Sequence, residues 1–481
     1  MKRIVLSTLA ACLLLTNGGL AAPVPHPAAG QLDRIVGMAL ESGFLRDSAV
    51  QLIDGIGPRL AGSPNGLRAE ALAEARFRQA GVPLVRQEAV PVPLWQVHRV
   101  SVTLVSPTSF DVEAIALANS ASTPPQGLLL PVVDAGHGTP EELEALGEKV
   151  RGAALLVRTG VPEGHTWLHR TAKYAAAVKT GAAAFLYAPS AIGQPLRSGT
   201  VTLNGAPASI PAFSVPAAFA GWIARLTERH VQPKVRCTLL ADRLPATAHN
   251  VVADIPGSSP GEMILVGAHL DSWDRAQGAG DNGTGTLVLW QVARVLVDQG
   301  LRPRRTIRFV SFTGEEIGLL GSRRYVLDHH QELPAIRAMI NLDMIGEPTG
   351  FGTMLQPELA PILRKLADQL RGFGLDGKVP DRPGLFSDHQ SFLLAGVPIV
   401  TVRSRLRPEV AAAYHSAADT MDILDLGRQQ RAAAVTAALV WTLANVPELP
   451  THRLSPAEVR DALTAAGVDT SEINLPTEIG H

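Results

Sequence analysis

The stretch MILVGAHLDSWD, residues 263–274, decides the fold, because an unbroken apolar run is followed closely by a histidine and two aspartates. A run without polar alternation is typical of a strand that is buried on both faces. Further runs of this kind lie at 249–255, 306–313, 338–345 and 397–402. Helical patterns lie at 283–296, 358–370 and 428–443. This alternation predicts an α/β protein with a mostly parallel, mixed sheet covered by helices on both faces.

The chain of 481 residues is long enough for more than one domain. A basic start at Lys2 and Arg3, followed by an apolar stretch, predicts a secretory signal at residues 1–21. Cleavage there would leave Cys237 without a partner, so we expect a periplasmic or secreted protein that has no internal disulfide. After the signal, we expect one domain in two parts, at 22–114 and 244–450. A β-rich insert at 115–243 separates the two parts, and a tail follows at 451–481.

The charge balance excludes some classes of partner. The 43 Lys and Arg residues nearly equal the 44 Asp and Glu residues, which gives a net charge of −1. Nucleic-acid and anionic-membrane binders carry a basic excess, so this balance argues against both. No stretch beyond the signal is apolar over 18 residues, and no membrane span is expected. A homodimer is left open.

Metal-competent side chains follow the ends of several predicted strands or precede a helix. They are His269, Asp281, Glu316, Asp343 and His415. Each one alone would be interpreted as a solvated or capping residue. Because active residues of such sheets gather at the carboxyl edge, the whole set of imidazoles and carboxylates predicts a site for divalent metal ions there.

Five motifs resemble those of a known family. They are HLDSWD at 269–274, GAGDNG at 278–283, FTGEE at 312–316, NLD at 341–343 and HSAADT at 415–420. Together they resemble peptidase family M28, whose members are co-catalytic zinc peptidases, and residues 115–243 resemble the protease-associated insert of many members. The resemblance implies the zinc exopeptidase fold, two Zn²⁺ ions per chain and a peptide or dipeptide substrate.

By position, the resemblance also implies a role for each ligand. Asp281 would bridge the two zinc ions, with His269 and Asp343 completing one site and Glu316 and His415 the other. A bridging carboxylate suits this place, because two nearby dications repel each other unless an anion lies between them.

The neighbouring residues receive catalytic roles from the same resemblance. Glu315 is expected to act as the general base, since it lies next to a ligand and can take a proton from the attacking water. Asp271 is expected to fix the tautomer of the His269 imidazole. The family also suggests a cis peptide bond between Asp281 and Asn282.

Substrate-binding residues are less defined by the sequence. Asp388, in the run SDHQSF at 387–392, is expected to line the pocket or to cap the following helix, and Tyr414 lies next to a predicted ligand. Arg403, Arg405 and Arg407 would grip a substrate carboxylate or form a solvated strand end. We expect an aminopeptidase or dipeptidase, with a carboxypeptidase that uses these arginines as the alternative.

The sequence also offers alternative functions and motif matches. A single-zinc enzyme similar to glutaminyl cyclases and a non-catalytic protein that keeps the fold would both bind less than two equivalents of metal. The GxGxxG match at 278–283 lies too far behind its strand for dinucleotide binding, and the GxSxG match at 257–261 joins two strands. His165 and His169 lack the glutamate of a zinc-binding HExxH and are expected at the surface.

Overall fold

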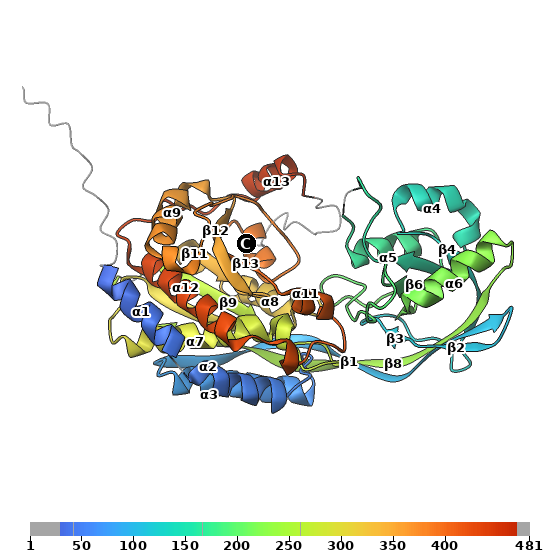
Figure 1. Ribbon diagram of the computed structural model, residues 1–481, viewed down its shortest axis with the longest axis horizontal. Helices are drawn as coiled ribbons and strands as arrows, with labels where there is room; N and C mark the ends of the chain where they lie inside the picture. Colours follow the sequence, from blue (N-terminus) through green and yellow to red (C-terminus); the bar gives the residue numbers. More distant parts are fainter. Residues whose placement is uncertain (1–28, 42, 166, 260, 469–481) are drawn as a thin grey trace, which may run out of the picture.

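The computed structural model describes residues 29–41, 43–165, 167–259 and 261–468, so the predicted signal at 1–21 and the end of the tail lie outside the described residues. Two lobes are joined by the long strands β1 (Leu84–Ser106) and β8 (Lys234–Ile255), which run side by side along the bottom of Figure 1. No helix in the described ranges has both the length and the hydropathy that crossing a bilayer requires.

The large lobe carries the predicted ligands together with five strands of the sheet, and His269 is the last residue of one of these strands. Its strands are β9 (Met263–His269), β10 (Thr306–Phe312), β11 (Ile336–Asn341), β12 (Glu347–Met354) and β13 (Ile399–Arg405). Its helices are α1 (Ala29–Glu41), α2 (Phe44–Ala49), α3 (Pro64–Gln79), α7 (Thr284–Asp298), α8 (Leu320–Asp328), α9 (Ala360–Gln369), α10 (His389–Leu394), α11 (Pro408–Ala413), α12 (Leu426–Asn445) and α13 (Pro456–Ala465).

The small lobe follows the first long strand in the chain. Its strands are β2 (Phe110–Val112), β3 (Ile115–Ala116), β4 (Leu128–Asp134), β5 (Ala154–Arg158), β6 (Ala184–Ala188) and β7 (Ala212–Ser214). Its helices are α4 (Pro140–Leu146), α5 (Arg170–Lys179) and α6 (Ala217–Glu228). One sheet runs through both lobes in the order β12-β13-β11-β9-β10-β8-β4-β5-β6-β7-β3, and β1 pairs with β8 and β2.

Helices cover both faces of the large-lobe sheet, as predicted. In β9, Ile264 and Val266 belong to the core that α7 and α12 cover, whereas Met263 and Leu265 face the core beneath α8 and α10. Strands β10, β9, β11 and β13 run parallel to one another. Strand β8 pairs antiparallel with β10, and β12 pairs antiparallel with β13. The carboxyl ends of the parallel strands therefore meet at one edge of the sheet.

The long ribbon differs from the prediction. The sequence predicts separate strands at 84–91 and 97–105 and a strand that begins at 249, whereas β1 spans 23 residues and β8 spans 22. The predicted boundary between 243 and 244 falls inside β8. Pro93 and Pro245 lie opposite each other in this ribbon, where prolines are tolerated because no third strand needs their missing N–H groups.

Candidate metal centre

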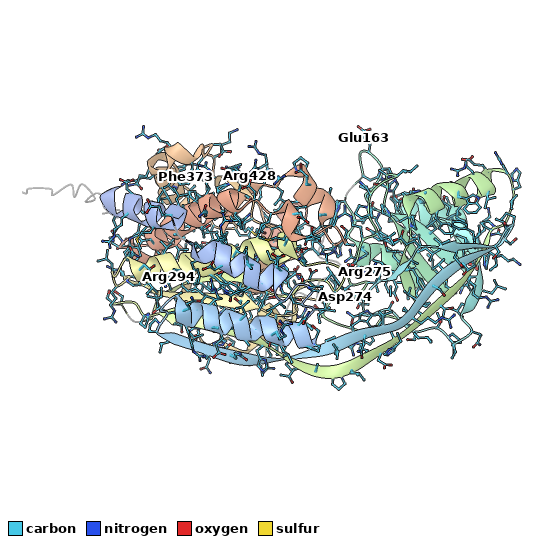
Figure 2. All side chains as sticks on the ribbon, turned by 60° about the horizontal axis from the view of Figure 1, so that its bottom comes forward. Glu163, Asp274, Arg275, Arg294, Phe373 and Arg428 are labelled. Atoms are coloured by element: carbon cyan, nitrogen blue, oxygen red, sulfur yellow. The ribbon has the colours of Figure 1, made fainter. Side chains whose placement is uncertain are left out.

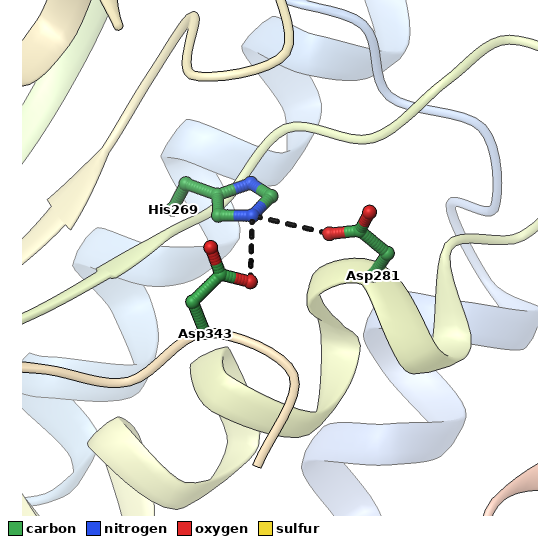
Figure 3. Close-up of side chains that lie close together, drawn as sticks. All are labelled: His269, Asp281 and Asp343. Atoms are coloured by element: carbon green, nitrogen blue, oxygen red, sulfur yellow. Dashed lines mark ion pairs between the residues drawn. The ribbon is translucent and has the colours of Figure 1, made fainter. Parts of the chain in front are cut away.

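The predicted ligands converge at the carboxyl edge of the large-lobe sheet. His269 ends β9, and its Nε2 lies 3.2 Å from Oδ1 of Asp281 and 3.5 Å from Oδ1 of Asp343, as Figure 3 shows. On the other side, Nε2 of His415 lies 3.1 Å from Oδ2 of Asp281 and 3.1 Å from Oε2 of Glu316. The two oxygens of the Asp281 carboxylate thus face two different histidines.

The donor set fits a pair of bound cations. Ligand atoms of His269, Asp281 and Asp343 lie within 4.8 Å of one another, and so do those of Asp281, Glu316 and His415. Oε1 of Glu316 is buried and has no hydrogen-bond partner among the described residues. A buried, unpaired carboxylate oxygen is costly unless a cation binds there, and mixed imidazole and carboxylate ligands suit a metal of intermediate softness.

Mutual charges dominate the electrostatics of this centre. Burial, together with the charge of Asp281, raises the pKa of Glu316 to about 7. Burial opposes protonation of His415, but the charge of Glu316 and the hydrogen bonds that the imidazole donates to Asp281 and Glu316 raise its pKa to about 9. The pKa of Asp281 stays well below its usual value despite burial, because both histidines hydrogen-bond to it. The centre is therefore built to concentrate negative charge around one carboxylate.

The loop between His269 and Asp281 is held by a buried arginine that the sequence analysis missed. Arg59 is fully buried, and its guanidinium donates to the carbonyl oxygens of Leu270 at 2.6 Å, Gln277 at 2.5 Å and Gly278 at 2.8 Å. The residue lies more than 200 positions before this loop, and no motif surrounds it.

Asp419 fixes the bridging residue from the other side. Its carboxylate accepts hydrogen bonds from the backbone N–H of Gly280 at 2.5 Å and of Asp281 at 3.0 Å. The peptide bond between Asp281 and Asn282 is cis, as the resemblance implies. The position of the Asp281 carboxylate thus depends on the backbone contacts of two side chains, Arg59 and Asp419.

Asp271 has a different contact from the one expected. His269 Nδ1 lies 3.1 Å from the carbonyl oxygen of Asp271, whereas the Asp271 carboxylate lies 3.7 Å away, beyond hydrogen-bond distance. That carboxylate instead accepts the backbone N–H groups of Glu315 at 3.1 Å and Glu316 at 3.3 Å. The main chain of Asp271 orients the imidazole, and its side chain holds the loop that carries the predicted base and a predicted ligand.

Glu315 lies beside the ligands with its side chain half-buried. Burial, together with the charges of Asp343 and Glu316, raises the pKa of Glu315 well above its usual value, although His269 opposes this shift. A carboxylate with a raised pKa is a stronger proton acceptor than an ordinary one, which suits the predicted role of Glu315 as a base.

Two of the predicted substrate-binding residues lie beside the centre. Asp388 is fully buried, makes no capping hydrogen bond to α10, and burial raises its pKa to about 7. Its neighbour Ser387 donates to Oδ2 of Asp343 at 2.5 Å. Tyr414 stacks on His415 with ring centroids 3.8 Å apart and stays 38% exposed.

The three arginines of β13 and the following loop are placed elsewhere. Arg403 donates to the carbonyl oxygens of Phe351 and Lys378 and pairs with Asp376. Arg407 pairs with Glu409 at 3.3 Å, and Arg405 is exposed. Among the described residues, the partners of Arg403 and Arg407 include none of the five predicted ligands.

The small lobe reaches the centre through residues that sequence reasoning did not select. The Ser198 N–H donates to the carbonyl oxygen of His415 at 2.6 Å. His169, expected at the surface, is half-buried, caps α5 and stacks on Phe386 with ring centroids 4.6 Å apart. Trp167 packs against the same Phe386 ring and is 58% exposed.

Comparisons with known proteins show which family the chain is similar to. The model of peptidase family M28 matches residues 250–440. Carboxypeptidase Q of Rattus norvegicus is 30% identical over 405 residues, which cover 83% of this chain and 84% of that protein. Carboxypeptidase Q of Homo sapiens is 28% identical over 405 residues, with coverage of 83% and 84%.

Two solved structures share the fold. The peptidase M28 precursor from Shewanella amazonensis has a TM-score of 0.77 at 24% identity, covering 89% of this chain and 99% of that one. A zinc aminopeptidase from Bacillus subtilis has a TM-score of 0.63 at 23% identity, with coverage of 90% and 98%. Fold, site and likeness define the class of this protein as a metallo-exopeptidase. The chain belongs to peptidase family M28.

Proposed function

We propose that this protein is a di-zinc exopeptidase that hydrolyses the N-terminal bond of peptides or dipeptides. Asp281 would hold both ions, with His269 and Asp343 as the further ligands of one and Glu316 and His415 as the further ligands of the other. The single observation that carries the proposal is the Asp281 carboxylate, whose two oxygens lie 3.2 Å and 3.1 Å from the Nε2 atoms of two different histidines. A carboxylate shared in this way is the arrangement that two neighbouring dications require.

The chain's own residues account for the proton transfers. Zinc, when bound, supplies Lewis-acid chemistry that polarises the scissile carbonyl and lowers the pKa of water. The Glu315 carboxylate accepts the proton of the attacking water and then donates it to the amine of the leaving residue. Asp271 holds the backbone of Glu315 and Glu316, so that base and ligand keep a fixed spacing. No side chain is required to form a covalent intermediate.

The negative charge of the metal centre favours one end of the substrate. A cluster of carboxylates favours a free α-amino group on the substrate, and the buried Asp388 carboxylate adds to that cluster. The carboxypeptidase alternative depended on Arg403, Arg405 and Arg407. Arg403 is engaged by Asp376 and by the carbonyl oxygen of Lys378, Arg407 pairs with Glu409, and Arg405 is exposed. We therefore favour an aminopeptidase or dipeptidase. From the sequence we also propose export after cleavage of residues 1–21 and a protease-associated insert at 115–243.

Metal stoichiometry tests the proposal directly. After loading with zinc and desalting, mass spectrometry is expected to find two equivalents per chain, and Asp281→Asn is expected to lose at least one. Asp274→Asn is a matched control, because Asp274 lies in the same loop but is exposed between the two lobes, as Figure 2 shows. A single equivalent in the wild type would favour a cyclase-like enzyme. Aminoacyl anilides, unblocked dipeptides and N-blocked peptides assayed side by side then separate the terminal specificities.

A further inference from the structure

A loop of the small lobe, residues 197–205, contacts the main chain at a predicted metal ligand. The Ser198 N–H donates to the carbonyl oxygen of His415 at 2.6 Å, and the Arg197 guanidinium donates to the carbonyl oxygen of Tyr414. His415 has a φ of 56°, which lies in the left-handed region. Because a residue with a side chain is strained there, the surrounding contacts must hold His415 in this conformation.

The same loop contacts the segment that follows a second predicted ligand, Glu316. Gly318 has a φ of 125°, and a Cβ added to it would lie only 2.5 Å from the backbone nitrogen of Gly205. The two backbones are therefore in direct contact, which only glycine permits at this position. Arg323, on helix α8, donates from its guanidinium to the side-chain oxygen of Asn204. The 197–205 loop thus supports the chain just after Glu316.

Side chains beside both of these ligands also belong to the core of the small lobe. Ile317, which directly follows Glu316, is fully buried in the hydrophobic cluster that contains Leu156 of β5. Trp273 belongs to the same cluster, and its ring packs edge-on against the His415 ring with centroids 5.8 Å apart. Because close-packed side chains transmit displacements, a shift of the small lobe would move both ligands.

The other two predicted ligands are held by the large lobe. The carbonyl oxygen of His269 accepts the Thr286 hydroxyl at 2.8 Å, and its Nδ1 lies 3.1 Å from the carbonyl oxygen of Asp271. Asp343 accepts the Ser387 hydroxyl at 2.5 Å. Among the residues that the structure describes, no hydrogen bond joins His269 or Asp343 to the small lobe. The support of the metal centre is therefore asymmetric.

We propose that the 197–205 loop positions the group formed by Asp281, Glu316 and His415, which we call the His415 half of the metal centre. Zinc binding in this half and docking of the small lobe then stabilise each other, because a coupling between two binding events is reciprocal. The group of His269, Asp281 and Asp343, the His269 half, binds zinc independently of the small lobe. This inference rests on the proposed function, from which it takes the two ions.

The test measures the zinc affinity of each half by competition with a chromophoric chelator, without any substrate. His269→Ala leaves the His415 half intact, and His415→Ala leaves the His269 half intact. Arg197→Met combined with Arg323→Met removes two side-chain contacts of the 197–205 loop and changes no ligand. In the His269→Ala background this pair is expected to weaken zinc binding by about 10–100-fold, as for other groups that orient a ligand. In the His415→Ala background the affinity should not change.

Two matched variants control for the loss of positive charge. Arg324→Met changes the neighbour of Arg323 on α8, whose guanidinium pairs with Asp328 of the same helix at 2.6 Å. Arg225→Met removes an exposed arginine of the small lobe. Neither variant should alter the zinc affinity of either half. Thermal melting followed by circular dichroism establishes that each variant is folded.

A distance measurement tests the reciprocal effect and needs none of the arginine variants. Figure 2 shows Glu163 on the small lobe and Arg428 on the large lobe, so spin labels on Glu163→Cys and Arg428→Cys report the distance between the lobes. Cys237 is buried and should not react with the label. Zinc is expected to narrow the distance distribution in the His269→Ala background but not in the His415→Ala background.

Each outcome has a defined meaning. Equal losses of affinity in both halves, or no loss in the His415 half of a folded variant, would overturn the inference. A distance distribution that ignores zinc in both backgrounds would overturn it as well. A single zinc equivalent in the wild type, or failure to hydrolyse any peptide, would contradict the proposed function. The chelator competition would then still show whether zinc bound through His415 depends on the small lobe.

Discussion

Replacing Arg59 by methionine should weaken both the fold and the metal centre. The guanidinium makes four hydrogen bonds to carbonyl oxygens, three of them from the loop that leads to Asp281 and one from Gly57 at 3.2 Å. At about 1.5–3 kcal/mol for a bond with a charged donor, the gross contribution is at least about 6 kcal/mol.

Burial offsets part of that contribution. Burial, only partly opposed by nearby carboxylates of which Asp419 has the largest effect, lowers the pKa of Arg59 to about 10. Relative to an ordinary arginine, this shift corresponds to a cost on the order of 3 kcal/mol for the charged form. The net loss on substitution by methionine is therefore expected to be about 3–5 kcal/mol, as for other buried charges whose partners are left unpaired.

Urea denaturation and zinc titration test this expectation. Arg59→Met should lower the free energy of unfolding by that amount, and zinc affinity should fall by about 10–100-fold, because the loop that presents Asp281 loses its support. Arg68→Met is the matched control, since Arg68 is an exposed arginine that bonds the carbonyl of Gly55. A variant that unfolds at the same urea concentration and binds zinc as tightly as the wild type would refute the reasoning.

Three further predictions follow from the same contacts. Glu315→Gln should keep its metal content and melting temperature yet lose about 10²–10⁴ in kcat, and unchanged turnover would exclude Glu315 as the base. Chelation should lower the melting temperature of the wild type, whereas Asp281→Ala should melt early and respond little to the chelator, because metal binding adds to folding free energy. The hydrogen bond that His329 donates to the Glu88 carboxylate raises the pKa of His329, so the stabilisation from this pair is complete below about pH 6.5 and is lost as pH rises through the raised value. His329→Gln should therefore flatten the pH dependence of the melting temperature in that window.

The large-lobe sheet could be predicted because its signals are local. Residues 263–269 form an apolar run in the sequence and are strand β9 in the structure, with the same bounds. A strand that is apolar throughout implies cover on both faces, and parallel strands place their carboxyl ends at one edge. From these two rules alone, His269 and Asp343 are expected near each other, although 74 positions separate them.

The ribbon of β1 and β8 could not be predicted in the same way. Prolines at 91, 93 and 245 interrupt the pattern of a strand, and the sequence analysis divided the chain there. In the structure, the middle of the ribbon has no third strand on either side of these prolines, so their missing N–H groups cost no ladder hydrogen bond. Whether a proline ends a strand depends on its neighbours in space, which the local sequence does not contain.

The arginines show why the binding residues around the metal centre were harder to find than the ligands. The β13 arginines have the alternating pattern of a binding site, yet Arg403 is neutralised by Asp376. Arg59 is the opposite case, because no motif surrounds it, yet it is fully buried and donates to the carbonyl oxygens of the loop before Asp281. Whether an arginine is free to bind a substrate is a property of the folded chain, because it depends on which carboxylates and carbonyl oxygens the fold brings to its guanidinium.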